Sequence, residues 1–202
     1  MIKLRKSDLS YRFEEHKKWI NSLGKEGKRL NIDEVDLSES CMEREIYEQA
    51  YITECIFNNR NIKNISFYLS KLCSSSFKCC NLKKIDFTKA DLSYVDFTSS
   101  ILCNVNFNKC ECIETNFSNS RLTNIRMTNA LFDTVDLRNV IMSNVDLSFS
   151  SFNKVLVKGI SLKNIIGIDK ITSLSINIGD LDKSVILQGK DAMQWLKSNV
   201  LQ

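Results

Sequence analysis

Residues 85–104 read IDFTK-ADLSY-VDFTS-SILCN, and this stretch decides the fold. In each group of five, a small or β-branched uncharged residue stands first and a large apolar residue stands third. The third position is apolar at every fifth residue from Phe67 to Leu162, twenty times in succession. Because 43% of the chain is hydrophobic, such a run would arise by chance with odds on the order of 10⁻⁸. A five-residue repeat therefore organises most of the chain.

The period of five matches neither a helix nor a long strand. A mostly polar residue separates the two apolar positions, and this alternation is typical of a short strand whose side chains point inward, outward and inward. Each unit is therefore predicted to be a short extended segment followed by a corner. A tight corner requires positive φ, and since no Gly stands between Gly27 and Gly159, Asn is expected to replace it. The Asn residues at corner positions are Asn59, Asn64, Asn104, Asn119, Asn124, Asn129, Asn139, Asn144 and Asn164.

The pattern small–polar–Leu/Phe–X–X, seen clearly in residues 85–94, resembles the pentapeptide repeat family. The resemblance implies an all-β solenoid, a right-handed quadrilateral β-helix in which four pentapeptides make one coil. The sequence itself supports a coil of 20 residues, because three columns recur in that phase. The β-branched column is Ile65, Ile85, Val105, Ile125, Val145 and Ile165; the small column is Ser70, Ala90, Cys110, Ala130 and Ser150; an Asn column stands at 64, 104, 124, 144 and 164 and is broken by Lys84.

The register weakens before residue 65. If the five-residue spacing continued unchanged toward the N-terminus, the side chains of Glu45 and Arg60 would point into the core. Burying an unpaired charge is unfavourable. A looser first coil or a local insertion around residues 42–50 is therefore expected, with a buried Glu45–Arg60 ion pair as the alternative. The path of residues 32–62 stays open at this point.

Both ends of a solenoid expose strand edges and an apolar cross-section unless they are covered. Leu9, Phe13, His16, Ile20 and Leu23 recur at helical spacing, which predicts a capping helix over residues 8–23 with His16 packed in its apolar stripe. The expected division is a capping helix and linker at 1–31, the β-helix at 32–165, clear from 65, and a C-terminal cap at 166–202. Within that cap, strands are expected at 174–178 and 185–187, followed by a helix over 191–201. That helix, with Ala192, Leu196 and Val200 on one face, either caps the rod, which is favoured, or forms a dimer contact.

The composition argues against catalysis and against a membrane span. The single histidine, His16, lies on an apolar stripe, and no catalytic residues, cofactor or metal are expected. No 18-residue apolar stretch and no apolar core of signal-peptide length exist, so a cytoplasmic protein is expected; a bacterial source is what the family resemblance implies. The eight cysteines follow the repeat and are expected to be reduced. Four of them, Cys55, Cys80, Cys110 and Cys112, should face inward, whereas Cys41, Cys73, Cys79 and Cys103 should lie outward or at corners, with Cys73 and Cys103 reacting quickly.

Charges separate when the sequence is folded onto 20-residue coils. Residues 91–97, 111–117 and 131–137 stack on two adjacent walls and carry no Lys or Arg. This acidic flank is the candidate partner-binding surface, and its side chains are expected to point outward, so that reversing Asp96, Glu114 and Asp136 to Lys should leave the fold intact. Its members are Asp91, Asp96, Glu111, Glu114, Asp133 and Asp136. The opposite side gathers basic residues against Asp86 and Asp146: Lys78, Lys83, Lys84, Lys89, Lys109, Arg121, Arg126 and Arg138.

Two functions are consistent with such a rod. The first is a non-enzymatic scaffold that presents a flat wall to a protein partner, as solenoids commonly do. The alternative comes from the family resemblance: members that mimic DNA bind bacterial type II topoisomerases, DNA gyrase or topoisomerase IV, and protect them from quinolones or toxins. The array here is only mildly acidic and has no long interrupting loop, so the scaffold is ranked first. The hypothesis of direct nucleic-acid binding is ranked below both, because the lysines lack interleaved aromatic residues.

Overall fold

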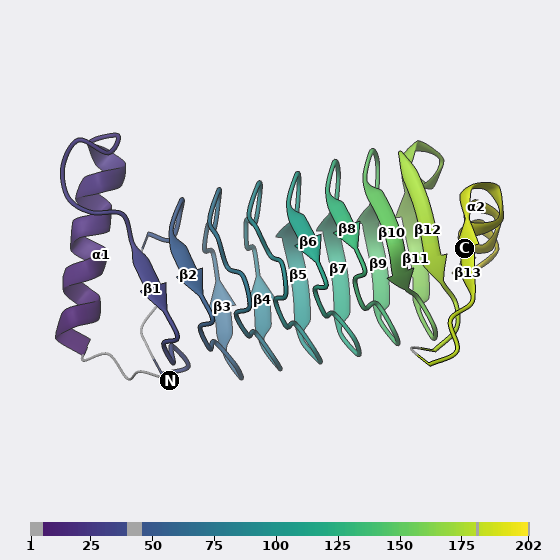
Figure 1. Cartoon of the computed structure of the whole chain (residues 1–202), viewed down its shortest axis with the longest axis horizontal. Helices are drawn as coiled ribbons and strands as arrows, with labels where there is room; N and C mark the ends of the chain where they lie inside the picture. Colours follow the sequence, from purple (N-terminus) through teal and green to yellow (C-terminus); the bar gives the residue numbers. More distant parts are fainter. Residues whose placement is uncertain (1–5, 40–45, 181, 202) are drawn as a thin grey trace.

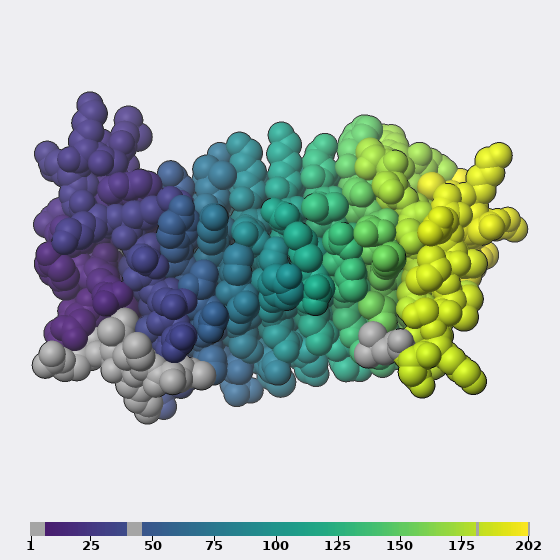
Figure 2. All heavy atoms as spheres, viewed as in Figure 1, coloured from purple at the N-terminus to yellow at the C-terminus, as the bar shows by residue number. Residues whose placement is uncertain are grey.

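The computed structural model describes residues 6–39, 46–180 and 182–201. It is a rod with α1 (Lys6–Asn21) at one end and α2 (Gly189–Ser198) at the other (Figures 1 and 2). Between them lies a parallel β-solenoid of about seven coils, so the expected all-β solenoid is confirmed. No helix among the described residues is long and apolar enough to cross a membrane.

Two rows of strands run along the rod (Figure 1). One is a seven-stranded sheet whose strands are β3 (Asn61–Lys63), β4 (Asn81–Lys83), β5 (Ile101–Asn106), β7 (Arg121–Arg126), β9 (Ile141–Asp146), β11 (Ser161–Ile166) and β14 (Val200–Leu201). The other contains β6 (Glu111–Ile113), β8 (Leu131–Asp133), β10 (Ser151–Leu156), β12 (Ser173–Asn177) and the antiparallel β13 (Ile186–Gln188). Successive coils pair residues twenty apart, as Leu82 with Leu102 and Leu102 with Leu122, which confirms the 20-residue coil.

Every fifth residue from Gln49 to Asn164 has a positive φ, so each coil has four corners. All nine predicted Asn residues occupy such corners. Many other corners hold side chains that disfavour this backbone region, among them Tyr94 (φ 63°), Thr134 (φ 55°) and Phe149 (φ 61°). The stacking of coils therefore overrides the local preference of the corner residue.

The core is a column of stacked rings along the axis. Phe97 is fully buried and stacks on Phe77 and Phe117, with ring centroids 5.3 and 4.9 Å away. Small residues at the first position of the units do more than leave room, because several of their hydroxyls bond to the backbone of the neighbouring coil. The Ser75 hydroxyl, for example, donates to the Ile52 carbonyl and accepts the Cys55 N–H, at 2.9 and 3.0 Å.

The described residues of the first coils keep the 20-residue register, so the insertion expected as one alternative is wrong. The looser coil expected as the other alternative falls partly on residues 40–45, which lie outside the described residues. The strands β1 (Asn31–Asp33) and β2 (Tyr51–Thr53) pair twenty residues apart. Tyr47 is buried and Gln49 is a corner in phase with the rest. Glu45 lies outside the described residues. Arg60 does not point into the core as the unchanged five-residue spacing predicted; its guanidinium donates to the carbonyls of Leu37 and Ser38, at 3.0 and 2.6 Å, so backbone oxygens stabilise its charge.

Helix α1 packs on the first coil through Phe13 and His16. The Phe13 ring meets Tyr47 at a centroid distance of 5.2 Å. His16 is fully buried, as expected of a packed histidine: its Nδ1 accepts the Leu30 N–H and its Nε2 donates to the Glu48 carbonyl, both at 3.0 Å. The helix ends two residues earlier than predicted, and Leu23 is not part of the apolar stripe, because it sits at φ 55° and is 90% exposed.

The C-terminal strands and helix are present, but the helix is shorter than predicted. After η1 (Ile168–Lys170), β12 pairs with β10 and β13 returns antiparallel to β12. Ala192 and Leu196 of α2 are buried against the end of the rod, which agrees with the favoured capping position. Val200 is not on the helix, because Val200 and Leu201 pair with Leu162 and Lys163 as an added strand.

Candidate protein-interaction face

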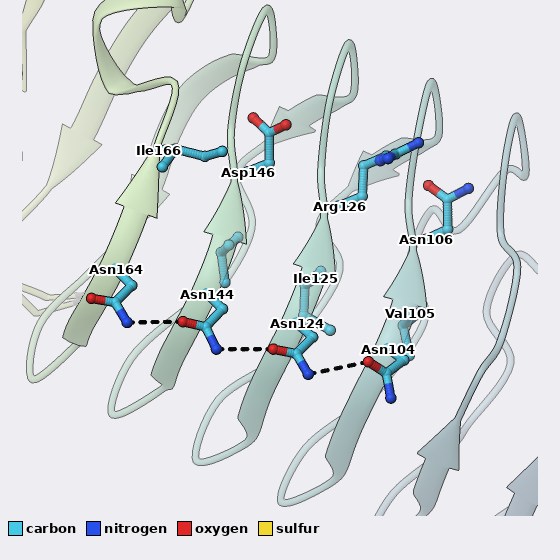
Figure 3. A pocket seen from close by; sticks show the side chains of 11 residues that line it. Asn104, Val105, Asn106, Asn124, Ile125, Arg126, Asn144, Asp146, Asn164 and Ile166 are labelled. Atoms are coloured by element: carbon cyan, nitrogen blue, oxygen red, sulfur yellow. Dashed lines mark hydrogen bonds between the residues drawn. The ribbon is translucent and has the colours of Figure 1, made fainter.

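The Asn column forms a hydrogen-bonded ladder along one corner (Figure 3). Asn124 donates to Asn104, Asn144 to Asn124 and Asn164 to Asn144, at 3.1, 2.9 and 2.9 Å. The ladder borders an open groove of about 550 Å³. Because the amides bond to one another along the axis, they hold neighbouring coils in register, and their capacity to bind a ligand is correspondingly reduced.

One wall of the rod carries a net negative charge, and we call it the acidic face. It consists of the outward residues in the segments 31–34, 51–54, 71–74, 91–94, 111–114, 131–134 and 151–154. These hold seven carboxylates and two lysines, or a net charge of −5. The charged residues are Asp33, Glu34, Glu54, Asp91, Glu111, Glu114 and Asp133, with Lys71 and Lys154.

The structure divides the six predicted flank residues into two groups. Asp91, Glu111, Glu114 and Asp133 lie on the acidic face, and Glu111 and Glu114 are exposed. In contrast, Asp96 and Asp136 lie on the adjacent wall, where they pair with Asn116 of the coil between them. This agrees with the two adjacent walls expected from the sequence, and the acidic face is the one of them that extends beyond residues 91–137.

Half of the flank carboxylates support the corners. Asp91, Asp96 and Asp136 each accept the backbone N–H two residues on, at 3.1, 2.8 and 2.9 Å. Burial opposes ionisation of Asp91, but hydrogen bonds from Ser93 and Cys73 outweigh it, so the pKa of Asp91 lies below its ordinary value. These carboxylates are Asx-type turn residues, and reversing them would destabilise the corners.

Two residues assigned to the basic side lie beside acidic ones. Lys78 Nζ is 3.0 Å from the Asp96 carboxylate, and the Arg138 guanidinium is 2.6 Å from that of Asp136. That pairing raises the pKa of Arg138. Because each makes a backbone hydrogen bond and an ion pair, charge reversal at Asp96 and Asp136 is now expected to lower stability.

Sequence reasoning missed Tyr94 and the acidic residues of the first coils. Tyr94 is 54% exposed at a corner of the acidic face, and its backbone N–H donates to Ile113 of the next coil, beside Glu114. Asp33, Glu34 and Glu54 were left out because the register before residue 65 was doubted, although the regular phase of Tyr47, Ile52 and Phe57 was a usable signal.

The cysteines lie largely where the repeat placed them. Cys55, Cys80, Cys110 and Cys112 are buried free thiols, Cys79 is exposed, and Cys73 and Cys103 are partly buried. Cys41 lies outside the described residues. Among the described residues, no group of three His, Cys, Asp or Glu could hold a metal ion.

Alkylation of the native protein at pH 8 should modify Cys79 first. Burial, together with the neighbouring Asp91, raises the pKa of Cys73 to about 11, which leaves it with roughly a hundredfold less reactive thiolate than an ordinary thiol. The expectation that Cys73 reacts quickly is corrected accordingly. Iodoacetamide labelling with peptide mass spectrometry measures the order, and a Cys73 rate equal to that of Cys79 would contradict this burial.

These features define a parallel β-solenoid built from five-residue units. A family model described as pentapeptide repeats matches residues 74–108 and 110–148 in eight copies. Residues 74–108 and 110–148 are therefore built of pentapeptide repeats, as the sequence pattern predicted.

Solved structures of other pentapeptide repeat proteins resemble the chain only distantly. Rfr23 from the cyanobacterium Cyanothece 51142 is 15% identical over 57% of this chain and 90% of its own, with a TM-score of 0.41. Full-length QnrB1, a plasmid-mediated fluoroquinolone resistance protein, is 15% identical over 71% and 88%, with a TM-score of 0.28. HetL from Nostoc sp. strain PCC 7120, involved in heterocyst differentiation regulation, is 12% identical over 73% and 78%, with a TM-score of 0.24. No curated protein sequence matches the chain.

Proposed function

We propose that this protein is a non-enzymatic scaffold of the bacterial cytoplasm that binds a protein partner through the acidic face, with Tyr94 as its anchor. The observation that carries the proposal is the exposed aromatic ring of Tyr94 among the carboxylates of the acidic face. Its side chain is 54% exposed and its φ is 63°. An aromatic side chain of this kind, surrounded by charged groups, is typical of the energetic centre of a protein interface.

Tyr94 is one of two aromatic side chains that the described part of the rod exposes at corners; the other, Phe149, is 55% exposed at φ 61° but lies on a different corner of the rod, outside the segments that form the acidic face. A residue other than Gly or Asn in the left-handed region costs roughly 1 kcal/mol or more, and Asn stands at nine other corners of this rod. With more than half of its surface in solvent, Tyr94 recovers only part of that cost by packing. Contact with a partner would bury the remaining exposed surface of the Tyr94 ring.

The charges around Tyr94 indicate the chemistry of the partner. Glu114 occupies the equivalent corner of the next coil, and Asp91 and Glu111 lie opposite one another in adjacent coils. A surface that carries Arg and Lys around an apolar pocket would complement this arrangement, and its association would be steered by charge and weakened by salt.

Capture from a bacterial lysate tests the acidic face. The double variant Glu111→Lys/Glu114→Lys should capture at least about tenfold less of the partner than wild type. Both side chains are exposed, and the loss of two contacts of about 0.7 kcal/mol each lowers the affinity about tenfold. The matched control is Glu14→Lys/Glu26→Lys, which changes the net charge equally at exposed sites of the N-terminal segment. Equal capture by wild type and the face variant would contradict the proposal.

The DNA-mimic function remains the alternative, favoured by the stacked pair Asp91 and Glu111, because parallel coils about 4.8 Å apart hold carboxylates in rows. Its test uses DNA gyrase and topoisomerase IV. A DNA mimic would bind either enzyme at low salt and alter gyrase supercoiling with or without quinolone, and the Glu111→Lys/Glu114→Lys variant would lose that effect. Unchanged supercoiling and no binding would eliminate the mimic and leave the scaffold.

A further inference from the structure

We propose that the acidic face of one molecule binds the opposite, basic wall of a second copy of the same chain, so that rods associate side by side. This inference goes beyond the proposed function, because it names a second occupant for the acidic face and assigns a role to a wall that the scaffold does not use.

The basic face consists of the outward residues in the segments 61–64, 81–84, 101–104, 121–124, 141–144 and 161–164. It carries five positive charges and no carboxylate. All five side chains are exposed, and none forms an ion pair within the described part of the chain. They are Lys63, Lys83, Lys84, Arg121 and Lys163.

The two faces lie on opposite sides of the rod. Each coil has four sides of five residues, so residues ten apart in the sequence, such as Arg121 and Leu131, occupy opposite walls. The net charges are +5 on the basic face and −5 on the acidic face. Two parallel copies can therefore bring complementary walls together without turning either rod.

Both walls are shaped for such contact. Each is built from parallel pairing between successive coils, and each exposes apolar side chains: Ile101 and Ile141 on the basic face are 49% and 39% exposed, and Leu131 on the acidic face is 38% exposed. When two sheets pack face to face, they lie about 10 Å apart and the side chains between them interdigitate. Burying them adds a short-range contribution to the long-range attraction of the charges.

The contact would be heterologous, so it does not close on itself. One copy uses its basic face and the next uses its acidic face, which leaves a free face at each end of the stack. A wall of six coils measures roughly 29 by 17 Å, or about 500 Å² per copy. Since a stable interface buries about 800 Å² per partner, the association should be weak, dependent on concentration and reversed by salt.

Sedimentation velocity of the full chain at about 100 μM tests the association. The weight-average sedimentation coefficient should rise by at least about a third between 500 mM and 20 mM salt, because screening is strong at the higher concentration. A value that stays at the monomer level in 20 mM salt would overturn the proposal.

Two charge variants then test which faces meet. Lys83→Glu/Arg121→Glu reduces the basic face from +5 to +1, and Glu111→Lys/Glu114→Lys changes the acidic face from −5 to −1. Each variant alone should remain monomeric. Their equimolar mixture should form a 1:1 complex that grows no further, because the intact acidic face of the first meets the intact basic face of the second. A mixture that stays monomeric, or one that polymerises, would contradict the assigned faces.

The control Lys25→Glu/Lys28→Glu changes the net charge by the same amount in the exposed N-terminal segment and should associate as wild type does. The variant Lys83→Glu/Arg121→Glu also separates this inference from the scaffold function, since it should lose self-association and still capture the protein partner.

Discussion

Replacement of Phe97 by Ala is expected to lower the free energy of unfolding by about 3 to 5 kcal/mol. Phe97 is fully buried and stacks between Phe77 and Phe117. Its ring also meets the edge of Phe87, at a centroid distance of 5.9 Å. Removing it leaves a cavity on the axis that coils fixed by interstrand hydrogen bonds cannot close by moving together. Equilibrium denaturation in urea measures the loss.

The matched control is Thr98→Ala, one residue further along the same coil. The side chain of Thr98 points outward. The hydrogen bond to Asp96 is donated by the backbone N–H of Thr98, at 2.8 Å, so an Ala at this position retains it. The expected change is within about 0.5 kcal/mol. Equal losses for the two variants would contradict the inward and outward assignment of the whole repeat.

The stability of the rod is expected to fall as the pH drops below about 6.5, because of His16. Burial lowers the pKa of His16 in the folded protein, with the hydrogen bond to the Glu48 carbonyl acting in the opposite direction. The imidazole is neutral in the folded state, since its Nδ1 accepts the Leu30 N–H. The unfolded chain therefore binds the extra proton, and acid favours unfolding by up to about 1.4 kcal/mol per pH unit.

Thermal melts between pH 8 and pH 5 measure this dependence, and His16→Gln is the control. Gln cannot titrate, and its amide can still donate toward the Glu48 carbonyl. Its stability should be lower at pH 8 but should change less on acidification. A variant that loses stability with acid as steeply as wild type would show that His16 is not the titrating group.

The sequence was sufficient to predict the repeat, the 20-residue coil and the core, because these depend on periodic burial. Phe77, Phe97 and Phe117 could be assigned to one stacked column from spacing alone. The buried position of His16 followed from the apolar stripe of its helix. The strand formed by Val200 and Leu201 could not be predicted, because a sheet edge that recruits a distant segment leaves no local pattern.

The candidate site could be predicted only in part. Folding the charges onto coils located Glu111 and Glu114, but charge alone did not distinguish them from Asp96 and Asp136, whose carboxylates support the backbone at corners. The sequence alone does not show whether the carboxylate of an Asp accepts a backbone hydrogen bond in an Asx turn or is free to contact a partner. The conformational cost at Tyr94 was likewise invisible, since positive φ is imposed by the stacking of coils and not by the residue itself.

The most direct test of the central claim, that the acidic face binds a partner through Tyr94, is to compare Tyr94→Asn with Ser99→Asn. Both positions are exposed corners of one coil with φ near 60°, but Ser99 lies on a different corner of the rod. Both variants should be as stable as wild type or more stable, by up to about 1 kcal/mol. Quantitative mass spectrometry of proteins retained from lysate should show the partner lost from Tyr94→Asn and kept by Ser99→Asn. Undiminished capture by a stably folded Tyr94→Asn variant would contradict the claim.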